Sequence, residues 1–244
     1  MSSAAPVDLS IVLPCCNEAG CVEALADEIV ASVKPLGLGY EILYVDDGST
    51  DGTVAALLRA RSRHPEVRIV RHAINCGQSA AMATGFERAR GSVLIVMDSD
   101  GQSDPADIPR LIEALRGHDC VATKRRQRQD DFVKRVASKI ANAFRNAVTG
   151  DDRISDAGCA YRAIRREALR ELFVWNGMHR FLPTILRLQG FRITEIEVNH
   201  RPRTTGRSKY GIGDRLWRGI ADCIAMRWYR KRVIPAQRVE PGES

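Results

Sequence analysis

Over its first 125 residues, this chain alternates regularly between short β-branched runs and helical patterns. Strands are expected at 9–13, 40–45, 67–70, 93–97 and 120–123, and helices at 21–33, 53–63, 78–90 and 105–116. Such an alternation is typical of βαβ crossovers, which bring successive strands into a largely parallel sheet. The sequence therefore predicts an α/β fold in which helices cover both faces of a mostly parallel sheet.

The pattern changes after residue 124. An amphipathic helix is expected over 132–148, a strand over 190–199, a basic aperiodic loop over 200–213 and a last helix over 213–232. No stretch approaches 18 consecutive apolar residues, so a membrane-spanning helix is not expected. The first residues lack the pattern of a secretory signal, and the seven cysteines form no Cys-x-x-Cys pair. These features favour a reduced, cytoplasmic protein.

Charge is distributed unevenly along the chain. The whole sequence has 37 Lys+Arg and 30 Asp+Glu, a formal net charge of +7. Residues 124–145 hold 8 basic and 2 acidic side chains, and residues 201–244 hold 11 and 4. Two basic segments on an otherwise acidic body predict an anionic partner, such as a phosphate, a lipid headgroup or a nucleic acid. Aromatic residues make up only 6% and do not interleave with the basic ones, which argues against nucleic acid.

Polar clusters follow the first, second and fourth expected strands, at 14–18, 46–51 and 98–102. Ligands of open parallel sheets bind outside the carboxyl ends of the strands, so the three clusters are expected to form one site. Ser49 and Asp51 fit local turn or capping roles equally well. Two acidic clusters at one edge are harder to explain locally, because like charges repel unless a cation or hydrogen-bond donors hold them.

Asp98, Asp100 and Gln102 alternate along an extended segment, which places their side chains on one side. Hard oxygen ligands at this spacing suit Mg²⁺ or Mn²⁺. Such an ion would bridge a diphosphate and stabilise it as a leaving group. Helix capping ahead of Pro105 fits Asp104 but leaves the two upstream aspartates unexplained.

Seven motifs carry a resemblance to a known family. Four resemble family 2 glycosyltransferases of the GT-A fold: Pro14-x-x-Asn17-Glu18, Val45-Asp-Asp-Gly-Ser49-x-Asp51, Asn75-x-Gly77 and Asp98-x-Asp100-Gly-Gln102-x-Asp-Pro105. Three more resemble its dolichol-phosphate mannose synthase-like branch, the polyprenyl-phosphate glycosyltransferases: Asp156-x-Gly158-Cys-x-Tyr161-Arg162, Met178-His-Arg-Phe-Leu-Pro183 and His200-Arg-Pro-Arg203-x-x-Gly206-x-Ser208-Lys209-Tyr210. The matches run in order from about residue 8 to residue 232. They imply a Rossmann-like GT-A domain over 1–205, followed over 206–244 by a basic loop and an amphipathic, membrane-associating helix.

The resemblance also implies roles for the matching positions. The donor nucleotide would be bound by Pro14, Asn17, Glu18, Asp46, Asp47 and Asp98. The metal would be held by Asp98, Asp100 and Gln102, and Asp156 is the candidate catalytic base. The acceptor phosphate and the loop that closes over the donor would involve Arg126, Arg135, Arg203 and Lys209. The pair Cys15-Cys16 departs from the family, whose members often carry a β-branched residue and an aromatic there.

The activity implied is an inverting, metal-dependent transfer of a sugar from a UDP- or GDP-sugar to a polyprenyl phosphate at the cytoplasmic face of a membrane. A phosphate acceptor is already anionic, so it needs positive charge and positioning more than a strong base, which fits the basic segment 124–145. An anionic membrane surface is the expected partner, a membrane-protein partner is compatible with it, and nucleic acid is not expected. One alternative is a transferase acting on a hydroxyl of a soluble or polysaccharide acceptor, with Asp156 as general base. Another is a non-catalytic nucleotide-sugar binder, which the intact Asp98, Asp100 and Gln102 set disfavours.

Overall fold

The computed structural model describes residues 6–126, 148, 150, 154–156, 158–202 and 212–235. Most of the helix predicted over 132–148 lies outside these residues, and so do Arg135, Arg203 and Lys209. The predictions for those positions stay predictions.

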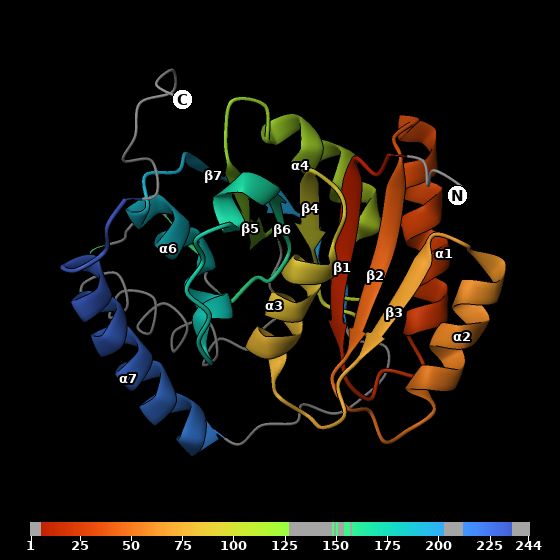
Figure 1. Cartoon of the computed structure of the whole chain (residues 1–244), viewed down its shortest axis with the longest axis horizontal. Coiled ribbons are helices and arrows are strands. Elements are labelled where there is room, and N and C mark those ends of the chain that lie inside the picture. Colours follow the sequence, from red (N-terminus) through yellow and green to blue (C-terminus); the bar gives the residue numbers. More distant parts are fainter. Residues whose placement is uncertain are drawn as a thin grey trace.

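A seven-stranded sheet forms the centre of the described structure (Figure 1). Its strands are β1 (Leu9–Cys15), β2 (Tyr40–Asp46), β3 (Val67–Arg71), β4 (Val93–Val96), β5 (Cys120–Arg125), β6 (Arg162–Arg165) and β7 (Ile193–Val198). They lie in the order β3-β2-β1-β4-β6-β5-β7. Strand β6 pairs antiparallel with both neighbours, whereas the other pairings are parallel. The prediction of a mostly parallel sheet is therefore confirmed.

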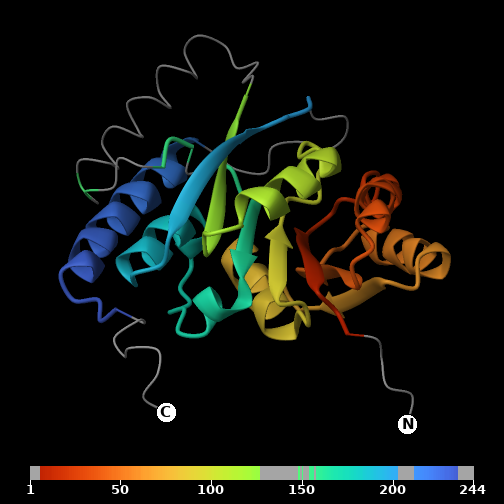
Figure 2. The same ribbon diagram turned by 90° about the horizontal axis from the view of Figure 1, so that it is seen from above.

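Helices cover both faces of this sheet, as predicted, and Figure 2 shows α3 and α4 on opposite sides. One face carries α1 (Val22–Val33), α2 (Thr53–Arg63) and α4 (Ile108–Ala114), and the other carries α3 (Gln78–Arg88), α6 (Leu182–Leu188) and α7 (Ile212–Arg230). Alternate residues of β1 point to opposite faces of the sheet and so belong to different hydrophobic cores. Ile11 and Leu13 pack in the core with α1, α2 and α4, and Val12 packs in the core with α3, α6 and α7.

Among the described residues, one strand and one α-helix were not predicted from the sequence, besides short 3₁₀ turns. Strand β6 has four residues and arginines at both ends, and α6 has seven residues, so neither shows enough periods to be recognised. The helix predicted at 105–116 divides into a 3₁₀ turn, η2 (Pro105–Asp107), and α4. The other predicted elements within the described residues are present, with ends shifted by a few residues.

The last helix, α7, packs onto the domain. Cys223 and Met226 are buried in the core formed with α3 and α6, and Asp222 lies 3.7 Å from Arg180 in an ion pair. The predicted division at residues 205 and 206 stays a prediction. Within the described residues, every helix is too short or too polar to cross a lipid bilayer.

Candidate functional site

The three polar clusters meet at the carboxyl ends of β1, β2 and β4, which are neighbours in the sheet. The Asn17 amide N–H donates to the Ser49 hydroxyl at 2.9 Å, and the Thr50 N–H donates to Asn17 Oδ1 at 2.8 Å. The Ser99 hydroxyl donates to the Pro14 carbonyl at 3.0 Å. Asn17 has a φ of 54°, a left-handed conformation that asparagine tolerates better than most residues. These contacts hold the segments after β1, β2 and β4 together at one edge of the sheet, as expected from the strand order.

The tandem aspartates after β2 have different surroundings. Asp46 is fully buried, and its Oδ2 lies 3.1 Å from Arg71 Nε. The Asp47 carboxylate accepts the backbone N–H groups of Cys76 and Gly77, each at 2.8 Å, and contacts His72 Nδ1 at 2.8 Å. Asp47 therefore ties the segment 72–77 to the end of β2.

One atom each of Asp47, His72 and Cys76 lie within 4.8 Å of one another, a grouping that could in principle hold a metal ion. His72 is already engaged at both ring nitrogens, because Nε2 lies 2.9 Å from the Thr84 hydroxyl. The Asp47 carboxylate is likewise occupied by protein donors. We interpret this grouping as a hydrogen-bonded loop anchor.

The candidate metal ligands follow β4. Asp98 Oδ1 accepts from Gln78 Nε2 at 2.9 Å, and Asp100, 9% exposed, accepts the Gln102 N–H at 3.1 Å. The Gln102 amide nitrogen donates to the Arg201 carbonyl at 3.3 Å, so the side-chain oxygen of Gln102 is the atom suited to a metal. Two carboxylates and an amide oxygen at one sheet edge are hard ligands, and they fit Mg²⁺ or Mn²⁺.

The start of the predicted closing loop is anchored beside these ligands. Ser103 and His200 form an isolated bridge, and the Arg201 N–H donates to the Gln102 carbonyl at 2.8 Å. The Arg201 guanidinium also pairs with Glu28 at 2.5 Å and Asp104 at 2.7 Å. The segment that leads to Arg203 and Lys209 therefore begins at the candidate metal loop.

At the end of β5, Asp156 is bound by Arg125 in a two-pronged ion pair. Arg125 Nε lies 2.7 Å from Asp156 Oδ2, and Nη2 lies 2.9 Å from Oδ1. Their side chains are only 16% and 13% exposed. The predicted acceptor residue was the neighbouring Arg126, which is exposed and whose N–H donates to the Val198 carbonyl; Arg125 was not predicted. Strand alternation in β5 was the signal that could have separated the two.

A buried histidine of the Met178–Pro183 motif, His179, also lies near the site. Burial, followed by the charges of Arg180 and Arg162, lowers the pKa of His179 from 6.5 to about 3. Its Nδ1 lies 2.8 Å from the Ser79 hydroxyl, which accepts the Gly177 N–H at 3.0 Å. Ser79 follows Gln78, so this group lies next to the support of Asp98.

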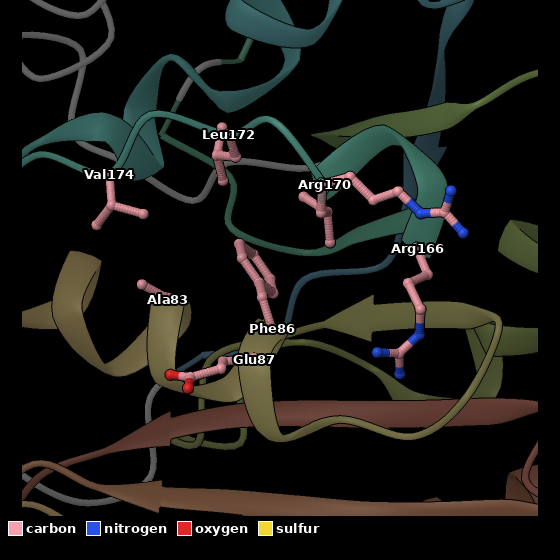
Figure 3. Close-up of a pocket in the computed structure, with 8 residues that line it drawn as sticks. Ala83, Phe86, Glu87, Arg166, Arg170, Leu172 and Val174 are labelled. Carbon is pink, nitrogen blue, oxygen red and sulfur yellow. The ribbon is translucent and has the colours of Figure 1, made fainter. Parts of the chain in front are cut away.

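A cavity of about 300 Å³ lies away from the predicted site (Figure 3). It is lined by Phe86 and Glu87 of α3 and by Arg166 and Arg170 of the 3₁₀ turn η3 (Arg166–Leu169) and its continuation. Arg166 binds the Gly91 carbonyl just before β4 begins, which places it toward the opposite ends of the strands. None of the predicted site residues lines this cavity.

The model of the family described as "Glycosyl transferase family 2" matches residues 10–173. An undecaprenyl-phosphate 4-deoxy-4-formamido-L-arabinose transferase from Aeromonas hydrophila is 37% identical over 207 residues, which is 84% of this chain and 63% of the relative. The protein of the same name from Edwardsiella ictaluri is 36% identical over the same shares. The chain thus spans less than two thirds of the length of these relatives.

Two solved structures share the fold. Glucosyl-3-phosphoglycerate synthase from Mycobacterium tuberculosis has a TM-score of 0.68 at 21% identity, covering 92% of this chain and 80% of the other. The mannosyltransferase PcManGT from Pyrobaculum calidifontis, solved with GDP-Man and Mn²⁺, has a TM-score of 0.63 at 20% identity, covering 93% and 64%. These similarities confirm the predicted GT-A fold.

Proposed function

Because the chain belongs to glycosyl transferase family 2, we propose that it transfers a sugar from a nucleotide-diphosphate sugar to a polyprenyl phosphate, with inversion at the anomeric carbon. The names of its 36–37% identical relatives support an undecaprenyl-type phosphate as acceptor. UDP- and GDP-sugars both remain candidate donors.

The observation that carries this proposal is the ion pair between Arg125 and Asp156. A carboxylate held by two guanidinium hydrogen bonds is stabilised in its charged form and is a poor proton acceptor. A sugar hydroxyl needs a base to accept its proton, whereas a phosphate monoester is already anionic near neutral pH. The site therefore suits a phosphate acceptor better than a hydroxyl.

The donor half would use the residues after β1, β2 and β4. Asp98, Asp100 and Gln102 would hold Mg²⁺ or Mn²⁺, which stabilises the diphosphate leaving group when bound. Asp46, fully buried at the end of β2, would face the nucleoside. The basic residues at the end of β5, Arg125 and Arg126, would attract the acceptor phosphate and orient it toward the sugar.

Two features of helix α7 favour association with a membrane. Ile224 and Trp228 are one helical turn apart and are 60% and 63% exposed. The positively charged side chains of Arg227 and Arg230 flank them, and further positive charges follow the helix end. An exposed apolar pair among cations suits the interface of an anionic bilayer. We place this helix on the cytoplasmic face, where the lipid phosphate would be reached.

The transfer is tested with purified full-length chain, Mn²⁺, undecaprenyl phosphate and a panel of labelled UDP- and GDP-sugars. We expect label in the organic phase with one donor, and we expect its loss with EDTA and in Asp100→Ala. Nucleotide release with label on a soluble hydroxyl acceptor, and none on the lipid, would refute the proposed acceptor.

Membrane association is tested by sedimentation with vesicles of anionic phospholipid. We expect binding to weaken at high salt, and to weaken several-fold when Ile224 and Trp228 are both changed to Ser. Ile74→Ser, at an exposed apolar residue on the loop before α3, is the matched control and should bind as the wild type does. Equal binding by the double variant would remove α7 as the membrane contact.

A further inference from the structure

Arg162 is a charged side chain in a place where charge is costly. It is the first residue of β6 and is 1% exposed. Because β6 runs against β4, Arg162 pairs with Val96, two residues before Asp98. A guanidinium stays protonated in proteins, so its burial requires nearby anions and acceptors.

The strand register and nearby contacts place two carboxylates close to the start of β6. Asp98 follows the paired Val96 by two residues, and Asp156 is bound by Arg125, two residues after Thr123, whose hydroxyl donates to the carbonyl of Tyr161 beside Arg162. Burial lowers the pKa of Arg162, while the charges of Cys120, Cys159, Asp98 and Asp156 act in the opposite direction. Burial also raises the pKa of Cys120 to about 12 and raises that of Cys159, so both thiols are neutral at pH 7. The negative charge in this set therefore comes from Asp98 and Asp156.

Arg162 is itself held in place. Its Nη1 donates to the His179 carbonyl at 2.6 Å, and the His179 ring is bound to the Ser79 hydroxyl at 2.8 Å. Gln78, the neighbour of Ser79, donates to Asp98 at 2.9 Å. Asp98 is thus supported by α3 directly, and the same helix supports Arg162 through His179.

We propose that Arg162 is a positioning residue whose buried guanidinium fixes Asp98 on the donor side and Asp156 on the acceptor side relative to each other. The first part of this proposal, the donor arm, is that Arg162 holds Asp98 in position for the metal-bound nucleotide. Nucleotide binding alone is enough to test it. The second part, the acceptor arm, is that Arg162 holds Asp156 in position. It rests on the proposed function, because Asp156 would position the phosphate acceptor through Arg125.

The test compares Arg162→Met and Arg162→Lys with a control on the same strand, Arg165→Met. Arg165 also donates to backbone carbonyls, those of His118 and Leu115, but it pairs with Val93 at the far end of β4. Calorimetry measures UDP and GDP binding with Mn²⁺ and without it. We expect Arg162→Met to weaken Mn²⁺-dependent binding by about tenfold or more, Arg162→Lys to restore most of it, and Arg165→Met to bind as the wild type does.

The kinetic readout separates positioning from folding. With the lipid acceptor, Arg162→Met should lower kcat and raise KM for the polyprenyl phosphate, whereas Arg165→Met should change only the unfolding midpoint. Equal effects of the two Met variants on nucleotide binding, or unchanged binding in Arg162→Met, would overturn the proposal.

A double-mutant cycle keeps the proposal testable where Arg162→Met does not fold. Arg162→Gln, which removes the charge and keeps a hydrogen-bond donor, Asp98→Asn and their combination are compared for Mn²⁺-dependent nucleotide binding. We expect the combined effect to be smaller than the sum, and additive effects would overturn the donor arm. Should wild-type protein bind nucleotide in this Arg162-dependent way but label no lipid, the proposed acceptor fails while the donor arm stands.

Discussion

Acidification should destabilise this protein through His179. In the folded chain, burial and then the charges of Arg180 and Arg162 lower the pKa of this imidazole to about 3, against 6.5 in the unfolded chain. The Ser79 hydroxyl accepts the Gly177 N–H, so its own proton is available to His179 Nδ1. That contact requires an unprotonated Nδ1, which agrees with a neutral ring.

The sign and size of the effect follow from these two pKa values. Between about pH 6.5 and pH 3 the unfolded chain binds the proton and the folded chain does not, so the free energy of unfolding falls as the pH falls through this window. Each pH unit is worth about 1.4 kcal/mol. From pH 7 to pH 5 the loss from this group is therefore about 2 kcal/mol.

Urea unfolding of wild type and His179→Asn at pH 7 and pH 5, at equal ionic strength, measures this loss. Asparagine keeps an acceptor near the position of Nδ1 but does not titrate. We expect the wild type to lose about 2 kcal/mol more than the variant. Equal losses, or an NMR titration that gives His179 a pKa near 6.5, would refute the reasoning.

Three further predictions concern carboxylates. Asp100→Ala should weaken Mn²⁺-dependent nucleotide binding at least 100-fold by order of magnitude while leaving the circular dichroism spectrum unchanged, and retained affinity would remove this ligand. Asp156→Asn should lower lipid transfer by no more than about tenfold, because loss of a true general base costs about 10²–10⁴-fold. A loss in that larger range would restore Asp156 as the general base. Glu41→Gln should lower the free energy of unfolding by about 1–3 kcal/mol, since this buried carboxylate accepts from Arg68, Ser10 and the Arg90 N–H, and unchanged urea midpoints would contradict that role.

The parts of the fold that could be predicted are those with repeated local signals. Strands β1 to β5 carry β-branched runs bounded by turn residues, and α1 to α3 repeat their apolar stripe over about three turns. Strand β6 reads Arg-Ala-Ile-Arg, and a fully buried arginine at its start contradicts the apolar pattern of a central strand. Tertiary pairing decides its structure, so a sequence window does not show it.

The candidate site also has parts that could be predicted from the sequence and parts that could not. The clusters after β1, β2 and β4 could be predicted to meet, because parallel strands end at one edge. A sequence does not show that Arg125, rather than Arg126, pairs with Asp156, or that the Asp47 carboxylate accepts the Gly77 N–H. Both contacts depend on how segments distant in the sequence approach one another. The resemblance placed Asp156 on the acceptor side but did not show its guanidinium partner.

The reversed direction of β6 has an evolutionary consequence. The parallel strands β1, β2 and β4 present the segments that follow them to the proposed donor site, whereas β6 presents the segment that precedes it, residues 154–156 and 158–161, beside the end of β5. The proposed donor and acceptor surfaces therefore come from separate stretches of chain, which meet where β6 begins opposite the end of β4. We expect a chimera that exchanges residues 126–161 for those of a relative to change which acceptor is glycosylated and to leave sugar-nucleotide selection intact.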